Sequence, residues 1–193
     1  MKFLFLLFIL FSFQLSAQQT EPSIKDLKAG RYKTDTSFIY SLPYEGGKSY
    51  LLIQAYQSNL SHKGEYALDF KMKEGTNICA ARSGVVVSIR EESDKGGLKP
   101  EMLSEGNYII IEHGDGSQAH YWHLQKDGVL VNEGDTVEQG QIIGLSGNTG
   151  YSAFPHLHFE VMHPGKGQVP TRFYTKKGVK YLRPGKWHQA IPF

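Results

Sequence analysis

Two histidines at alternate positions, His156 and His158, lie in a short and otherwise mostly apolar run near the end of the chain. Residues two apart on an extended segment point to the same face, so both imidazoles would project together, about 7 Å apart at the backbone. Leu157 and Phe159 would then point to the opposite face, towards a core. Paired imidazoles in this arrangement can bind a metal ion or transfer a proton.

Three more residues upstream have types suited to the same site: His62, Asp69 and His123. Asp69 lies in an apolar segment, where an unpaired buried carboxylate would cost several kcal/mol and a metal cation would remove that cost. With His156 and His158, the set meets the needs of an open zinc site, which has three protein ligands and a position for water. The sequence therefore predicts a zinc hydrolase, although these residue types alone do not separate ligands from bases.

The other histidines have plainer explanations. Alternation along the segment places Tyr121 and His123 on one face and His120 with Trp122 on the other, so we expect a structural role for His120. We expect three more to be solvated surface residues, because they lie in turns or in the tail: His113, His163 and His188.

The first residues have the order of a secretory signal peptide, with a basic start, a short apolar run and a small residue at Ala17. The apolar run covers residues 3–13, whereas a membrane-spanning helix needs about 20 residues. We expect residues 1–17 to be removed and no transmembrane helix to be retained. The product would be exported, either periplasmic or secreted.

The remaining 176 residues suit one domain with its own core. We expect a lead-in over residues 18–48, a zinc peptidase domain over 49–165 and a C-terminal extension over 166–193 that packs on the domain. Cys79 is the only cysteine, so no disulfide can form within the chain, and its apolar neighbours predict a buried residue.

The formal net charge of the chain is +2, which is too small to suggest nucleic acid as a partner. We expect a monomer. Three lysines near the end are expected to form a solvated turn: Lys176, Lys177 and Lys180.

Short β-branched and aromatic runs separated by glycine turns, with no convincing amphipathic helix, predict an all-β fold, an antiparallel sandwich or barrel-like domain. A glycine-rich turn at residues 113–116 predicts that the runs before and after it form a hairpin. Residues 91–106 break the pattern and are expected to form a long loop at the rim that faces the substrate. The expected strands cover residues 50–54, 66–72, 84–89, 108–112, 118–124, 141–145 and 156–162.

A series of motifs between about residues 49 and 164, in this order, closely resembles the lysostaphin-type (LytM-type) zinc metallopeptidases. The motifs are residues 61–64 (Ser-His-Lys-Gly), 67–70 (Ala-Leu-Asp-Phe), 75–76 (Gly-Thr), 80–86 (Ala-Ala-Arg-Ser-Gly-Val-Val), 120–124 (His-Tyr-Trp-His-Leu), 144–152 (Gly-Leu-Ser-Gly-Asn-Thr-Gly-Tyr-Ser) and 156–160 (His-Leu-His-Phe-Glu).

The resemblance implies one Zn²⁺ per chain, held by His62, Asp69 and His158. It implies that His123 and His156 serve the attacking water and the developing oxyanion. Members of the family have a small antiparallel β fold with the site in a groove, and they typically cut peptide bonds in the stems or cross-links of bacterial peptidoglycan by a zinc-activated water.

The sequence departs from the family pattern in two places. Six residues separate His62 from Asp69, where the best-known members have three, and a longer turn would have to bring both to one metal. Ala153 and Phe154 stand where a Gly-Pro pair is common, a change expected to affect the groove wall more than the metal.

Three alternatives remain open from the sequence. The chain could be a non-catalytic wall-binding module that activates other wall enzymes. It could be a zinc peptidase that acts on other secreted proteins or on glycine-rich peptides. A phosphocarrier of carbohydrate transport with a related β fold is a third alternative, which the signal peptide disfavours because such a protein works in the cytoplasm.

Overall fold

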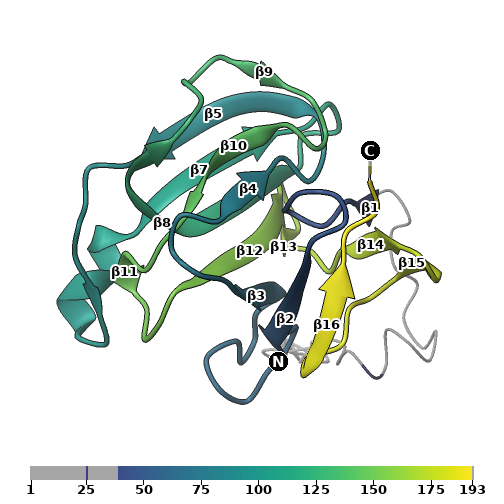
Figure 1. Cartoon of the computed structure of the whole chain (residues 1–193), viewed down its shortest axis with the longest axis horizontal. Coiled ribbons are helices and arrows are strands. Elements are labelled where there is room, and N and C mark those ends of the chain that lie inside the picture. The colour runs from purple at the N-terminus through teal and green to yellow at the C-terminus, as the bar shows by residue number, and fades with distance from the viewer. Residues whose placement is uncertain (1–24, 26–38, 193) are drawn as a thin grey trace, which may run out of the picture.

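The structure, a computed structural model, describes Lys25 and residues 39–192. The described part is almost entirely β, as predicted, with one short 3-10 helix, η1 (Pro100–Glu105) (Figure 1). The strands are β1 (Ile39–Tyr40), β2 (Ser49–Gln54), β3 (Ala67–Lys71), β4 (Asn77–Cys79), β5 (Gly84–Arg90), β6 (Gly96–Gly97), β7 (Asn107–Glu112), β8 (Gln118–Val129), β9 (Thr136–Val137), β10 (Ile142–Ser146), β11 (Gly150–Tyr151), β12 (His156–His163), β13 (Gly167–Gln168), β14 (Arg172–Thr175), β15 (Gly178–Lys180) and β16 (Lys186–Gln189).

The main sheet has the strand order β16-β2-β3-β12-β8-β7-β5-β9, and all of these neighbours pair antiparallel. Strand β10 joins β8 and β4, and β13 pairs with the end of β12. The predicted hairpin is confirmed, because β7 pairs antiparallel with β8 from Tyr108 opposite Trp122 to Glu112 opposite Gln118. The two longest strands, β8 and β12, thus pair with each other in the middle of the sheet.

Alternate residues of the central strands fill the core, as period-2 patterning requires. Leu68 and Phe70 on β3 and Leu157 and Phe159 on β12 are at most 1% exposed. Cys79 is also fully buried, as predicted, and burial raises the pKa of its thiol to about 12. The residues between these core positions therefore face the other side of the sheet, where the candidate site lies.

Segments from both ends of the described chain complete the sheets. Strand β1 pairs parallel with β14 in a small sheet that also contains β15, and β16 pairs antiparallel with β2 at the edge of the main sheet. Tyr40 and Tyr44, within the expected lead-in, and Phe173, within the expected extension, are fully buried. The expected signal peptide, residues 1–17, lies outside the described residues.

The predicted rim loop over residues 91–106 carries β6 and η1. Gly96 and Gly97 pair parallel with Gly150 and Tyr151 of β11. The loop is therefore joined by strand pairing to the segment that precedes β12. Among the residues that the structure describes, no helix is long and apolar enough to cross a membrane.

The expectation that His113 is a solvated turn residue is wrong: its side chain is 3% exposed. The ring of Tyr40 from β1 packs edge-on against it at 5.3 Å between ring centroids, and Nδ1 donates a hydrogen bond to the carbonyl oxygen of Ser83 at 2.9 Å. The turn itself is at the surface, but β1, about 70 residues earlier in the chain, covers this side of it.

Candidate metal centre

Strands β3 and β12 place Asp69 and His158 directly opposite each other. Directly opposed residues of an antiparallel pair project from the same face of the sheet, and their Cβ atoms lie about 5 Å apart. Here Nδ1 of His158 lies 2.9 Å from Oδ1 of Asp69. The register of two central strands therefore fixes the first two members of the site.

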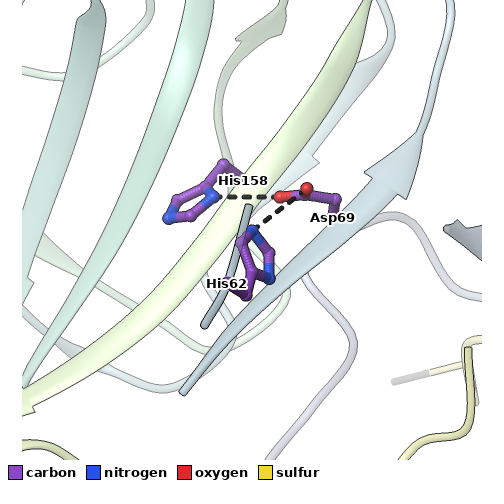
Figure 2. Close-up of side chains that lie close together, drawn as sticks. All are labelled: His62, Asp69 and His158. Carbon is purple, nitrogen blue, oxygen red and sulfur yellow. Dashed lines mark hydrogen bonds and ion pairs between the residues drawn. The ribbon is translucent and has the colours of Figure 1, made fainter. Parts of the chain in front are cut away.

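His62 reaches the same carboxylate from the loop before β3. The backbone N–H of Glu65 donates to the carbonyl oxygen of His62 at 3.0 Å, and Gly64 has a φ of 83°, a conformation that glycine adopts without strain. This turn brings Nε2 of His62 to 3.1 Å from Oδ2 of Asp69 (Figure 2). The six-residue spacing is thus compatible with a shared site.

His62, Asp69 and His158 form one compact cluster, with one potential ligand atom from each within 4.8 Å of the others (Figure 2). Two imidazole nitrogens and a carboxylate oxygen are the donors that zinc binds. The carboxylate is almost fully buried, with the residue 3% exposed, which is costly unless cations or hydrogen bonds compensate it. The donor set and the burial fit a single divalent cation.

Hydrogen bonds from outside the cluster orient two of its members. Nδ1 of His62 lies 3.1 Å from the carbonyl oxygen of Ala67, and because a carbonyl can only accept, Nδ1 carries the proton and Nε2 faces Asp69 with a free lone pair. Nε2 of Gln54, on β2, donates to Oδ2 of Asp69 at 2.8 Å. Such partners hold metal ligands in their binding orientation.

His123 joins the site because β8 is irregular at this residue. Its φ is 66°, and the β7–β8 register shifts there, with Tyr108 opposite Trp122 but Asn107 opposite Leu124. An extra residue in one strand is a β-bulge, and it reverses the alternation of side chains. The expectation that His123 shares a face with Tyr121 is therefore wrong: Tyr121 is fully buried in the core, and His123 lines the site.

His123 and His156 form a pair beside the cluster, with 4.6 Å between their ring centroids. Nδ1 of His123 donates to the carbonyl oxygen of Thr149 at 2.7 Å, and Nδ1 of His156 donates to that of Phe154 at 2.8 Å. Each neutral ring therefore keeps an unprotonated Nε2, which can accept a proton. Nε2 of His156 lies 3.7 Å from Oδ1 of Asp69.

The pKa values of the site residues are shifted in different directions by their surroundings. Burial opposes ionisation of Asp69, but the hydrogen bond from His158, and one from His62 when that ring is protonated on both nitrogens, outweigh it and hold the pKa of Asp69 well below its usual range. Burial likewise opposes protonation of His158, yet the hydrogen bond and charge of Asp69 raise its pKa. Burial, helped by the charges of His156 and His158, lowers the pKa of His123 to about 3, and burial also lowers the pKa of His156.

All five residues line one open cleft of about 730 Å³. The predicted rim loop contributes Leu98 and Leu103, which are 61% and 70% exposed. Tyr151 and Phe154, 44% and 42% exposed, and Trp122 add further apolar surface. Two small residues, Gly106 and Ala153, and six polar ones complete the lining: Gln54, Ser61, Glu65, Ser152, Glu160 and Gln168. The cleft can therefore hold an extended chain that offers both apolar and polar groups.

Sequence reasoning missed two contributors to this site. Gln54 ends a strand and gives no sign that its amide reaches Asp69. Thr149 anchors His123 through its carbonyl, while its hydroxyl donates to the carbonyl of Leu124 at 2.6 Å and accepts from the N–H of Asn107 at 3.0 Å. The only available signal for Thr149 was its position in the polar, glycine-rich run before the paired histidines.

The remaining histidines lie outside the five-residue group. Nδ1 of His120 lies 3.3 Å from Oε1 of Glu160, opposite it on β12. Nδ1 of His163 donates to the carbonyl oxygen of Pro164 at 2.6 Å, and Nε2 of His188 donates to that of Arg183 at 2.9 Å.

Comparison with known sequences gives two informative relatives. The peptidoglycan DD-endopeptidase ShyA of Vibrio cholerae serotype O1 is 41% identical over 98 residues, which are 51% of this chain and 20% of ShyA. Lysostaphin of Staphylococcus simulans is 45% identical over 98 residues, which are 50% of this chain and 18% of lysostaphin. The matched part of this chain thus spans about a fifth of the length of these curated relatives.

Solved structures agree in fold. The catalytic domain of the prophage-encoded M23 protein EnpA from Enterococcus faecalis superposes with a TM-score of 0.51 at 26% identity, over 67% of this chain and 92% of that one. The M23 metalloprotease Pseudoalterin, at 21% identity and a TM-score of 0.54, shares the fold over 80% of this chain and 96% of its own. Residues 62–170, more than half of the chain, match the family described as Peptidase family M23. These residues include all five members of the candidate site, and the chain therefore belongs to the M23 metallopeptidases.

Proposed function

We propose that this protein is an exported, zinc-dependent endopeptidase that hydrolyses peptide bonds in the stems or cross-links of bacterial peptidoglycan. The observation that carries the proposal is the convergence of His62, Asp69 and His158 on one point of an open cleft, beside the paired rings of His123 and His156. The names of the relatives support the substrate, since ShyA is a peptidoglycan DD-endopeptidase.

In this proposal His62, Asp69 and His158 hold one zinc ion. Zinc at such a site lowers the pKa of a bound water to about 7 and polarises the carbonyl of the scissile bond. The carboxylate of Asp69 supplies the negative charge of the ligand set, and its hydrogen bond from Gln54 keeps it in place. The protonated Nδ1 of His62 leaves Nε2 as the ligand nitrogen.

His123 and His156, beside the cluster, transfer protons and stabilise developing charge. Because the carbonyls of Thr149 and Phe154 fix Nδ1 as the protonated nitrogen of each ring, Nε2 is the atom that accepts a proton from the attacking water. The protonated ring can then donate a hydrogen bond to the developing oxyanion or pass the proton to the leaving amine. The φ of 66° at His123 places its ring where strand alternation would not.

The test is metal content together with digestion of purified peptidoglycan by residues 18–193. Wild type should carry about one zinc and release peptide fragments. Asp69→Ala should lose the metal and the activity. His156→Ala should keep the metal and cut about 100-fold more slowly, as expected for loss of a general acid–base.

His163→Ala is the matched control, because His163 ends the same strand and does not line the cleft. It should bind zinc and cut like wild type. A wild-type protein without metal would overturn the proposal, and one that binds zinc but releases nothing from peptidoglycan would overturn the proposed substrate.

A further inference from the structure

Charge is divided unequally along the chain. Residues 39–160 contain nine basic and sixteen acidic residues, whereas residues 161–193 contain seven basic residues and no acidic one. The two parts therefore carry formal charges of −7 and +7 at neutral pH. The small net charge of the chain hides this separation, which would orient the molecule in an electric field or at a charged surface.

Five of the seven cations gather around one hollow of about 330 Å³, between the β14–β15 hairpin and strand β16. Four of them, Lys176, Lys177, Arg183 and Lys186, are exposed, and Lys180 is half-buried. Among the described residues none of the five has an acidic partner. Their charges are thus available to a ligand, and we call this surface the basic hollow.

Large apolar side chains are exposed on the same two elements. Trp187 lines the basic hollow and is 68% exposed. Tyr174 and Val179 face each other across the β14–β15 hairpin and are 46% and 38% exposed. The hairpin tip, with Lys176 and Lys177, therefore has an apolar pair on one flank and the basic hollow on the other.

We propose that the basic hollow and the hairpin tip bind the surface of an anionic phospholipid membrane. Lysine and arginine are attracted to anionic headgroups, and tryptophan and tyrosine favour the level of the headgroups, where one end of the side chain is apolar and the other is wet. A soluble polyanion would be served by the cations alone and would leave the exposed indole and the Tyr174–Val179 pair in water. The acidic part of the molecule would be repelled, so that the C-terminal elements face the lipid.

This orientation has a consequence for the cleft. Trp187 is paired with Leu51, Leu51 with Lys71, and Lys71 with His156, so the four residues project from one face of the sheet. Three strand spacings of about 4.8 Å separate Trp187 from His156 at the backbone, or about 14 Å. A molecule held by Trp187 would keep its cleft close to the lipid surface.

The test is sedimentation of residues 18–193, which include every described residue, with vesicles of phosphatidylcholine containing 30% phosphatidylglycerol. Wild type should bind these vesicles and not pure phosphatidylcholine. The charge-reversal variant Lys176→Glu/Lys177→Glu/Lys180→Glu should bind at least about 100-fold more weakly, since each lysine near an anionic surface contributes about five-fold. Binding should also fall in 1 M salt, where screening is strong.

A matched control reverses three exposed lysines of the acidic part: Lys63→Glu/Lys73→Glu/Lys99→Glu. It makes the same change in net charge and should bind like wild type. Tryptophan emission should shift to shorter wavelength on binding in wild type and not in Trp187→Phe, although that variant keeps Trp122. Vesicle binding needs neither zinc nor peptide cleavage, so it can fail without affecting the proposed activity.

Equal binding by wild type and the Lys176→Glu/Lys177→Glu/Lys180→Glu variant would overturn the proposal. Tighter binding to soluble polyphosphate than to the vesicles, with no change in Trp187 emission, would overturn it in favour of a soluble polyanion. Retention on purified peptidoglycan instead of vesicles would likewise replace lipid with the wall as the partner.

Discussion

At the scale of single residues, backbone carbonyls decide which nitrogen of each histidine is available. Ala67, Thr149 and Phe154 accept from Nδ1 of His62, His123 and His156 respectively, and so expose three Nε2 atoms to the cleft. Sequence motifs could identify the histidines but not this choice, because the accepting carbonyls belong to residues of no particular type. The site thus depends on backbone positions as much as on its side chains.

Gln54→Ala should weaken zinc binding by about 10- to 100-fold, the usual effect of removing a partner of a metal ligand. The reason is the loss of the 2.8 Å hydrogen bond that orients Asp69. Competition with a zinc chelator measures the effect. Gln118→Ala is the control, since the side-chain amide of Gln118 donates to Glu112 at the surface, and equal zinc affinity in both variants would contradict the assigned role of Gln54.

His113 should make stability depend on pH. Burial lowers its pKa below 6.5 in the folded chain, so the folded state favours the neutral ring. This contribution is complete above pH 6.5 and is lost as pH falls below it, at up to about 1.4 kcal/mol per pH unit. Denaturant unfolding of wild type and His113→Gln from pH 8 to 5 should show a smaller fall in the variant, and parallel curves would contradict this prediction.

At the scale of elements, alternation predicted the strands well and failed at one irregular point. Each of the seven expected strands corresponds to an observed strand within one or two residues at most ends, and β8 is longer than expected. The bulge at His123 was not predictable, because a positive φ in a non-glycine residue is imposed by its surroundings. The turn from His62 to Glu65 could be anticipated only as a possibility, since Gly64 permits it without requiring it.

The segment that carries Thr149 must approach Gly106, the residue before β7, closely, and Gly150 makes this possible. A Cβ at Gly150 would lie 2.7 Å from Cα of Gly106 and 3.4 Å from Nδ1 of His123. Gly150→Ala should therefore displace His123, reduce peptidase activity at least ten-fold and lower the free energy of unfolding by more than the roughly 1 kcal/mol that positive φ alone costs. Activity assays and denaturant unfolding measure both effects.

Gly134→Ala separates the cost of crowding from the cost of a positive φ. Gly134 has a similar φ of 91°, but a Cβ there would have no atom within 4 Å. It should show the cost of the backbone conformation alone and retain full activity. If both variants lost the same stability and activity, crowding at Gly150 would not be the reason.

At the scale of the whole molecule, the expected lead-in and extension contribute to the core. Phe173 is fully buried and packs against Phe159 of β12, with 6.0 Å between ring centroids. Hydrophobic patterning does not reveal such pairing between distant segments, because it shows which face of a strand is buried and not which strand covers it. The class of fold was therefore predictable from the sequence, whereas the parallel pairing of β1 with β14 was not.

Phe173→Ala should lower the free energy of unfolding by about 3–5 kcal/mol, as for other buried phenylalanines. Tyr174→Ala is the control. The side chain of Tyr174, next to Phe173 in the chain, is 46% exposed, so its removal should lower the free energy of unfolding much less. Chemical denaturation of the two variants checks this. A single cooperative transition with the expected loss would show that residues 166–193 unfold together with the candidate metal centre, and an unchanged midpoint for Phe173→Ala would show that they do not.

The antiparallel pairing of β2 with β16 joins two segments that the ribosome makes far apart in time. Residues 49–54 are made early, but their edge partner is residues 186–189. At the end of this pairing, the N–H of Ala190 donates a hydrogen bond to the carbonyl oxygen of Lys48 at 3.0 Å. Until residues 186–189 have been synthesised, β2 keeps an open edge, and pairings over such a separation form slowly. The edge of the main sheet is therefore completed only after residue 189 has been made, and a chain interrupted before residue 186 would leave β2 open to pairing with another chain.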